Sequence, residues 1–560
     1  MLLKNDNVNG NLISDSNSQP DFNCTSITVV APPNHNVDTG KIVITNEYNP
    51  RLDEDNSQAH KFASADSKTD TAANQEVRTY PRRWFVLAIF VALSMSNAFQ
   101  WIEYAIIANI VTKYYRVQSI AVDWTSMIYM LAYIPFVWPA AFILDKYGLR
   151  LAGLLGAFGN ALGAWIKCAS ASQDRFAVTF LGQSIVGVSQ IFILGLPPKL
   201  AAVWFGPKEV STACALGVFG NQLGIAIGFL LPPIMVPNSD DVDVVQTGFL
   251  SLFFLSAGIN SLIFVMIFLF FKDGPPVPPS PAQKAAIAAT EDKNFFASVV
   301  QLFRNLNFIL LVVTYGLNVG AFYAVSTLLN QMVLEFHEGQ ELNVGRIGLL
   351  IVLSGMLGSV LTGVWLDRTK RFKLTTILVY LFSGIGMVLY TVTIDKNIEF
   401  VFISAFLLGF FMTGYLPLGF EFGAEITYPI SEGTTSGVLN AAAQIFGIAE
   451  TQSLGLLLNR SPVWVCNTIL CVILAIGTVL TCLIKSDLRR LRAGEMNADQ
   501  SQNDDATETT NFVKSETNQT ILDACKNDSS TIMLRTFADK PNDVSTVVTR
   551  NGNDLKADEV

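Results

Sequence analysis

The chain has 560 residues, of which 51% are hydrophobic and only 15% are charged, and its mean hydropathy is +0.40. About 25% of the residues of an ordinary soluble protein are charged, so this balance excludes that class, and it excludes disorder over most of the length. The net charge of −9 argues against a nucleic-acid partner, which requires a basic surface. Long apolar runs, such as 249–271, instead indicate a membrane protein.

The two ends of the chain differ in composition from its middle. Residues 1–83 and 485–560 hold about half of all charged residues and are rich in Asn, Ser, Thr and Asp. Such segments cannot bury enough apolar surface to fold, so we predict two disordered tails. Their acids account for most of the net negative charge, which therefore says little about a substrate.

Twelve apolar segments between the tails are long enough to cross a bilayer, which takes about 20 residues per helix. The sequence therefore predicts an all-α membrane protein with six spans in 84–271 and six in 306–484. A linker at 272–305 separates them and opens with a proline-rich, stiff stretch at 273–281. The predicted spans lie near 84–110, 125–144, 150–171, 176–200, 210–236, 248–271, 306–332, 346–366, 374–394, 399–420, 434–456 and 462–484.

The distribution of Lys and Arg predicts the orientation in the membrane. An even number of spans puts both tails and the linker on one side, and the loops of that side carry most of the loop Lys and Arg. Positive loops stay in the cytoplasm, so we expect both termini there.

Several kinds of chemistry are missing from the predicted spans. The three histidines, His35, His60 and His337, lie outside them, and no Lys or Arg is expected deep within one. The chain has no nucleotide-binding Gly-x-x-x-x-Gly-Lys motif, and its seven cysteines suggest no disulfide framework. We therefore expect no cofactor, no metal site and no enzymatic activity. The aromatic, amide and few carboxyl groups that remain suit a small cationic or zwitterionic solute.

Two loops on the cytoplasmic side are alike and lie 222 residues apart. Asp145, Gly148 and Arg150 follow the second span, and Asp367 and Arg368 follow the eighth. The first loop resembles a signature of the major facilitator superfamily, although the second lacks the glycine. We expect the two loops to latch helix ends that separate when the halves of a carrier rock. The alternative is an ordinary positively charged loop that contains one acid.

The same offset relates two aromatic residues, Trp101 and Tyr323. If an axis along the membrane normal relates the halves, these residues lie at one depth on opposite sides of it. Facing each other across a central cavity, they would bind a quaternary ammonium through cation–π attraction, worth about 2 kcal/mol or more when desolvated. The alternative is that both belong to the interfacial aromatic belt.

Polar residues at membrane depth are the other candidates for the site. Gln190 and Gln444 lie within the fourth and eleventh spans, where an amide can orient a hydroxyl or an ammonium. The alternative for each is a hydrogen bond between helices. Other polar residues at this depth include Asn97, Gln100, Glu103, Asn160, Glu421, Glu425 and Glu450.

Six blocks of the sequence resemble the feline leukaemia virus subgroup C receptor family. They are 96–104, 123–135, 320–331, 414–422, 425–429 and 443–447, and the resemblance spans residues 82–460. It implies a major facilitator fold and transport of choline and ethanolamine, with haem transport as an older description. It also implies that Trp101 and Tyr323 contact the ammonium and that Gln190 reads the polar end of the substrate. Met130, Phe322 and Gln444 match further expected positions around the cavity.

One position departs from the family pattern. Residue 103 is Glu, where glutamine is usual in the block that contains Trp101. Two residues correspond to about 200° around a helix, so Glu103 is expected to point away from the aromatic pair. There it would attract cations to the outer mouth or introduce a dependence on pH.

From these observations we predict a monomeric plasma-membrane carrier for choline and ethanolamine that works by alternating access in the lipid bilayer. Without an evident coupling-ion site, transport is expected to be driven by the gradient and the membrane potential. Two other functions stand as alternatives: haem transport, and a non-transporting receptor or sensor on a carrier scaffold. A mitochondrial or endoplasmic reticulum membrane is the alternative location.

Overall fold

The computed structural model describes residues 79–206, 208–279 and 295–492, and the backbone of three short strands near the C-terminus. The chain divides into a helical unit, Glu76–Ala493, and a second unit made of Met1–Gln75 and Gly494–Val560. The predicted disorder of the N-terminal tail concerns residues that lie, up to position 78, outside the described part.

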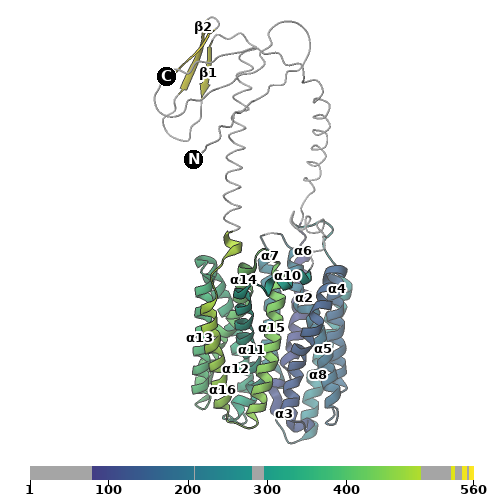
Figure 1. Ribbon diagram of the computed structural model, residues 1–560. Coiled ribbons are helices and arrows are strands. Elements are labelled where there is room, and N and C mark those ends of the chain that lie inside the picture. Colours follow the sequence, from purple (N-terminus) through teal and green to yellow (C-terminus); the bar gives the residue numbers. More distant parts are fainter. Residues whose placement is uncertain are drawn as a thin grey trace. The chain divides into compact units, whose positions relative to one another are not determined.

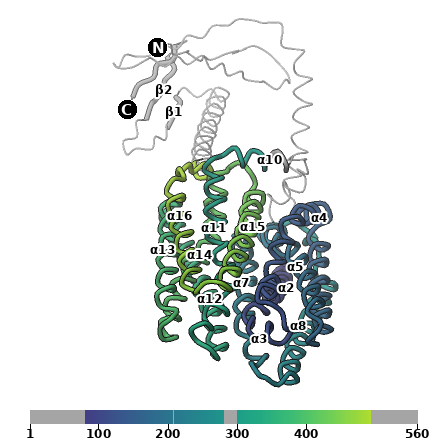
Figure 2. Tube along the Cα trace, turned by 60° about the horizontal axis from the view of Figure 1, so that its bottom comes forward, coloured from purple at the N-terminus to yellow at the C-terminus, as the bar shows by residue number. Residues whose placement is uncertain are grey.

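The helical unit has two groups of helices, one from each half of the sequence (Figures 1 and 2). A short helix, α10 (Phe295–Leu302), lies in the linker between the groups, in a segment predicted to be a spacer. The first group contains α2 (Arg82–Ile102), η1 (Ala105–Ile107), α3 (Ala108–Tyr115), α4 (Ser119–Cys168), α5 (Phe176–Leu194), α6 (Leu196–Trp204), α7 (Val210–Met235) and α8 (Val242–Phe270). The second contains α11 (Leu306–Leu334), α12 (Glu341–Thr369), α13 (Phe372–Thr393), α14 (Ile398–Thr427), α15 (Glu432–Leu458) and α16 (Val463–Leu483).

Ten continuous helical stretches of the described residues are long and apolar enough to cross a membrane. The 50-residue helix α4 contains two predicted spans, because Gly148 has φ 87° and ψ −178° and breaks the helix between them. Helix α15, with 27 residues, is the remaining predicted span and is not among these ten stretches. The structure thus accounts for all twelve predicted spans, but replaces the predicted loop at 145–149 by a sharp kink.

Two predicted spans are interrupted. The first ends as α2 at Ile102 and continues through the 3-10 turn η1 into α3, whereas one helix was expected over 84–110. The fourth changes from α5 to α6 at Gly195, and prolines follow at the start of α6 because the first turn of a helix tolerates a missing N–H. The first interruption places Trp101 next to the end of a helix.

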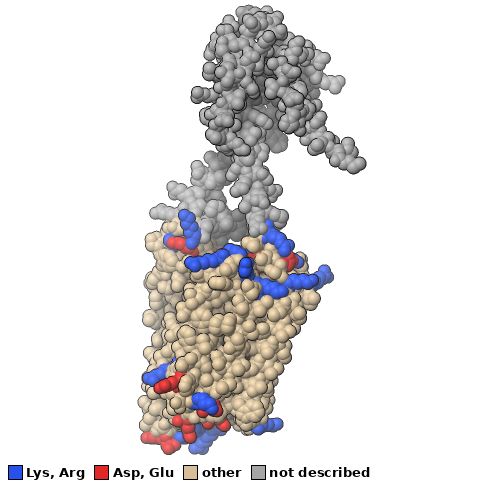
Figure 3. All heavy atoms as spheres, turned by 90° about the vertical axis from the view of Figure 1, so that its left-hand side faces the viewer, with Lys and Arg blue, Asp and Glu red and all other residues tan. Residues whose placement is uncertain are grey.

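Charged side chains gather at the two ends of the helical unit and leave an uncharged band between them (Figure 3). We call the end that carries the linker the linker end, and the opposite end, where α3 ends and α4 begins, the far end. Exposed apolar side chains on the helices include Phe254, Trp365 and Trp464. This distribution is that of a protein surrounded by lipid.

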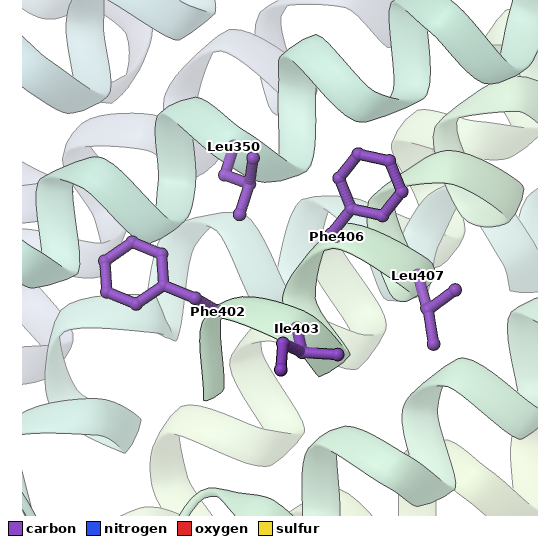
Figure 4. A pocket seen from close by; sticks show the side chains of 5 residues that line it. All are labelled: Leu350, Phe402, Ile403, Phe406 and Leu407. Atoms are coloured by element: carbon purple, nitrogen blue, oxygen red, sulfur yellow. The ribbon is translucent and has the colours of Figure 1, made fainter. Parts of the chain in front are cut away.

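A hollow of about 310 Å³ lies on the apolar surface between α12 and α14 (Figure 4). Its lining offers no hydrogen-bonding side chain, so it does not suit a polar solute. The residues that line it are Leu350, Phe402, Ile403, Phe406 and Leu407.

The two groups of helices contact each other mainly through α7 with α12 and α4 with α15, while η1 packs on α11. Within the groups, α2 packs on α7 and α11 packs on α15. The first helix of each group therefore lies next to the interface between the groups, where we predicted the substrate site.

The second unit contains strands β1 (Thr531–Arg535), β2 (Ser545–Asn551) and β3 (Asp554–Glu559). They form an antiparallel sheet in the order β1-β2-β3. Here the structure differs from the disorder predicted for 485–560. The Thr and Val residues of β2 favour a strand, which a composition argument over the whole tail does not resolve.

Candidate functional site

Trp101 of α2 and Tyr323 of α11 are in contact across the interface between the two groups. Their ring centroids are 5.6 Å apart and their planes are at 71°, an edge-to-face arrangement. Trp101 is only 4% exposed and Tyr323 is partly buried. The pair thus lies inside the protein and not in the interfacial belt that was the alternative. The rings touch edge to face, whereas we expected them to face each other across a central cavity.

The end of helix α2 and one hydrogen bond fix the position of the Trp101 indole. Helix α2 ends one residue after Trp101, and the indole N–H donates to the carbonyl oxygen of Ser126 in α4 at 3.3 Å. An ammonium binds an aromatic ring within about 6 Å of its centroid. A cation lying in the angle of this edge-to-face pair can satisfy that distance for both rings.

Met130 and Gly447 complete the surroundings of the Tyr323 ring. A Cβ atom at Gly447 of α15 would lie 2.8 Å from Cδ2 of Tyr323 and 3.0 Å from Sδ of Met130 in α4. Glycine at position 447 therefore allows α15 to approach both α11 and α4 closely. Met130 is buried, and its polarizable sulfur suits an aromatic and cationic environment.

The remaining predicted site residues occupy different positions. Gln444 is buried, with its side chain in hydrogen-bonding proximity to the Tyr323 hydroxyl. Phe322 is buried with its ring centroid 5.9 Å from that of Tyr323. Gln190 of α5 is partly exposed, and within the described part of the chain its amide makes no hydrogen bond. Its amide is therefore available to a ligand.

Replacement of Gly447 by alanine is expected to weaken substrate binding about tenfold, because overpacking of this kind costs about 1–3 kcal/mol. The new methyl group would push Tyr323 away from Met130. Concentration dependence of solute uptake measures the effect, with surface expression as the reference. Gly437→Ala on the same helix is the control, because a Cβ atom at Gly437 meets nothing within 4 Å. Equal half-saturation in both variants would contradict the proposed contact.

Glu103 does not lie at an outer mouth as expected but forms a buried ion pair with Lys167. Both side chains are 0% exposed. Lys167 lies near the end of the predicted span 150–171, and the expectation that no Lys or Arg lies deep within a span is therefore wrong. The lysine lies in the last turn of α4 and also reaches Oε1 of Gln183 at 3.3 Å, which in turn accepts the Tyr129 hydroxyl at 3.1 Å. Glu103 and Lys167 compensate each other's charge, so neither is free to meet a substrate.

Hydrogen bonds join the two groups of helices at the far end. The Asn330 amide of α11 donates to the carbonyl oxygen of Ile106 at 2.7 Å and to Oδ1 of Asn109 at 3.1 Å. Glu341 of α12 accepts from Asn109 at 3.0 Å and from Asn238 at 2.7 Å. These contacts hold the far end closed.

A second set of contacts lies between the far end and the aromatic pair. The hydroxyl groups of Ser126 and Thr327 are 3.0 Å apart, and the Gln331 amide donates to Asp123 at 2.7 Å. At the linker end, by contrast, ion pairs connect elements of the same group, such as Arg83 with Glu209 and Arg490 with Glu432. The closed side of this conformation is thus the far side.

The first predicted latch loop lies at the linker end and is held within its own group. Asp145 pairs with Lys199 at 2.8 Å. Oδ1 of Asp273, in the linker, accepts from the backbone N–H of Arg150 at 2.9 Å and lies directly beside Gly148. The carboxylate of Asp273 thus caps the helix that restarts after the glycine kink, a contact that the sequence did not reveal.

The second predicted latch loop shows no comparable contact in this conformation. Asp367 is exposed and lies 3.5 Å from Lys370 of the same loop. Arg368 is exposed in the last turn of α12. The structure does not bring the two loops together, so their action as latches stays a prediction.

Sequence reasoning missed the residues that close the far end. Asp123, Asn109 and Asn330 were given no role, because each is a common polar residue near the end of a span. The internal repeat contained a usable signal: the offset that relates Trp101 to Tyr323 also relates Asn109 to position 331, next to Asn330. Applying the offset to every polar residue would have suggested this contact.

Comparison with known proteins agrees with this architecture. Residues 84–451 match the family model of the Major Facilitator Superfamily. Among solved structures, a bacterial homologue of the human lysosomal transporter Spinster, in an inward-facing and occupied conformation, has a TM-score of 0.55 at 13% identity. It covers 73% of this chain and 98% of its own. At this identity the likeness shows the fold alone.

Curated relatives are far more similar in sequence. The choline/ethanolamine transporter flvcr2b of Danio rerio is 52% identical over 438 residues, which are 77% of this chain and 90% of the relative. Human choline/ethanolamine transporter FLVCR2 is 51% identical over 421 residues, covering 75% and 80%. An uncharacterised transporter of Caenorhabditis elegans is 56% identical over 420 residues, covering 75% and 72%. The chain therefore belongs to the major facilitator superfamily and, within it, to the feline leukaemia virus subgroup C receptor family.

Proposed function

We propose that this protein carries choline, and also ethanolamine, across a membrane by alternating access. The observation that carries the proposal is the contact between Trp101 and Tyr323, which come from different helix groups and meet edge to face at 5.6 Å. A quaternary ammonium has no N–H to donate, so aromatic faces are its natural partners. The names of the relatives from zebrafish and human support the same solutes, and they do not favour haem.

The remaining polar groups suit the other end of choline. Its hydroxyl can donate or accept a hydrogen bond, and the partly exposed Gln190 amide has both capacities free. Gln444 next to the Tyr323 hydroxyl offers a second amide. The ammonium of ethanolamine bears hydrogens, so it would donate to the amide oxygens of Gln190 and Gln444 in addition to contacting the aromatic rings.

The arrangement of contacts supports a transport cycle. With the far end closed by Asn330 and Glu341, the solute would leave toward the linker end. We place that end, and both termini, in the cytoplasm of a plasma-membrane protein, because its loops carry most of the Lys and Arg. Opening the far end requires the bonds between the helix groups to break, and in that state the loops at Asp145 and Asp367 would hold the linker end closed.

The membrane potential would drive uptake without a coupled ion. Moving one positive charge through a potential of about 100 mV is worth about 2.3 kcal/mol. In proteoliposomes, a potential that is negative inside is therefore expected to raise choline accumulation by the purified protein.

Replacing Trp101 or Tyr323 by alanine is expected to raise half-saturation for choline about thirtyfold, since a desolvated cation–π contact is worth about 2 kcal/mol. Uptake of labelled choline into proteoliposomes measures this directly. Trp464→Ala is the control, because Trp464 lies 59% exposed on the apolar surface. Wild-type protein that takes up no choline would refute the proposed function. Normal uptake by both variants would leave the function but remove the aromatic site.

A further inference from the structure

Glu450 of α15 is a buried carboxyl group that the transport mechanism does not yet use. The residue is 6% exposed, and within the described part of the chain neither carboxyl oxygen has a hydrogen-bond partner. Glu103, another buried glutamate, has a lysine beside it, and Glu425 accepts a backbone hydrogen bond. A lone ionised carboxylate is strongly disfavoured inside a membrane protein, and such groups commonly mark ion or substrate pathways.

The carboxyl group of Glu450 lies at the level of the aromatic pair. A Cβ atom at Gly320 of α11 would be 3.1 Å from Oε1 of Glu450 and 3.1 Å from the backbone nitrogen of Gly447. Gly447 in turn packs on the ring of Tyr323, which lies one helical turn beyond Gly320. Side chains lean toward the N-terminus of their helix, which brings the Glu450 carboxyl back to the level of Gly447.

The surroundings of Glu450 provide no compensating positive charge. Gly320 faces it from α11, and from α13 the Tyr380 phenol is near enough to act on it electrostatically. The Tyr380 hydroxyl itself donates to the carbonyl oxygen of Thr314 at 3.0 Å, so it is committed elsewhere. Within residues 79–206, 208–279 and 295–492, neither carboxyl oxygen of Glu450 accepts a hydrogen bond from a Lys, Arg or His side chain. A buried carboxyl group without such a partner is disfavoured as a lone carboxylate and favoured in its protonated form.

We propose that Glu450 releases this proton when the cationic substrate occupies the site at Trp101 and Tyr323. The O–H bond of the carboxyl group breaks, the proton leaves to water, and the substrate cation takes over as the compensating charge. The ionised carboxylate then distinguishes a cation from a neutral molecule of the same shape, which aromatic rings alone do less well. This inference rests on the proposed transport of choline and adds the group that selects for charge.

The test compares choline with its neutral isostere, 3,3-dimethylbutan-1-ol, as inhibitors of labelled choline uptake by purified protein in proteoliposomes. In the wild type, half-saturation for choline is expected to fall as pH rises, because protons compete with the cation for Glu450. In Glu450→Gln, half-saturation should be about tenfold higher and independent of pH. In this variant, the ratio of the affinity for choline to the affinity for the neutral alcohol should also be about ten times smaller than in the wild type.

Two further variants separate this role from a structural one. Glu425→Gln removes another buried glutamate of the same helix group, one that accepts from the backbone N–H of Leu491 at 2.7 Å, and it should keep the wild-type pH profile. Glu450→Asp keeps the carboxyl group and should retain both pH dependence and charge preference, even where Glu450→Gln folds poorly.

Two outcomes would overturn the inference. One is a Glu450→Gln variant with the wild-type pH profile and the wild-type preference for choline, while Trp101→Ala still impairs uptake; the proposed function would then survive. The other is a wild type that transports no choline, in which case the proposed function fails as well.

Discussion

Protein in which Lys167 is replaced by methionine is expected to be lost almost entirely from the membrane. Lys167 and Glu103 are both 0% exposed, and the single substitution leaves the Glu103 carboxylate in a dry interior without a counter-charge. Breaking a buried pair from one side costs about 3–5 kcal/mol, a large part of the stability of a typical domain. Cell-surface labelling and thermal unfolding of the solubilised protein measure the loss.

The double variant Glu103→Gln with Lys167→Met is the decisive control for this prediction. It removes both charges together, and replacing a whole buried pair is often neutral or stabilising. We expect it to recover most of the surface protein that Lys167→Met loses. If both variants were equally poor, the loss would come from packing around Gln183 and Tyr129 and not from charge.

Cross-linking the two helix groups at Ser126 and Thr327 is expected to stop transport completely. Their hydroxyl oxygens are 3.0 Å apart, so cysteines at both positions place two sulfur atoms within reach of a disulfide. The bond would hold the far end closed and prevent the step that admits solute from that side. Choline uptake after treatment with a membrane-permeant oxidant measures the block, and a reductant should restore uptake.

The single variants Ser126→Cys and Thr327→Cys control for reactions of one cysteine. The five native cysteines of the described residues are free thiols, so the oxidised wild type is a further reference. Uptake that persists in the cross-linked double variant would show that the far end need not open. The proposed alternating access would then be wrong.

Sequence reasoning predicted the membrane architecture well, because hydropathy depends on length and composition alone. It also paired Trp101 with Tyr323, because the repeat of 222 residues places corresponding positions at the same depth. Their edge-to-face contact could not be predicted, since it depends on how closely the two helix groups approach in this conformation.

Other features escaped prediction for definite physical reasons. Lys167 stands at the end of an apolar segment, where a lysine is normally a loop residue, and only its partner Glu103 shows that it is buried. Gly148 was recognised within its motif, but its positive φ of 87° is what reduces the expected loop to a kink. The hydrogen bonds at the far end exist in one conformation of the carrier. The sequence alone does not indicate which conformation makes which contacts.

Because the first helix is interrupted after Ile102, α2 and α3 are joined by a bend. Trp101 lies on one side of the bend, and on the other side the carbonyl oxygen of Ile106 accepts a hydrogen bond from the opposite helix group. Helix α3 has eight residues, is about 12 Å long and connects the bend to the closed far end. If a solute displaces the indole, we expect the movement to reach this hydrogen bond through the short segment between Trp101 and Ile106.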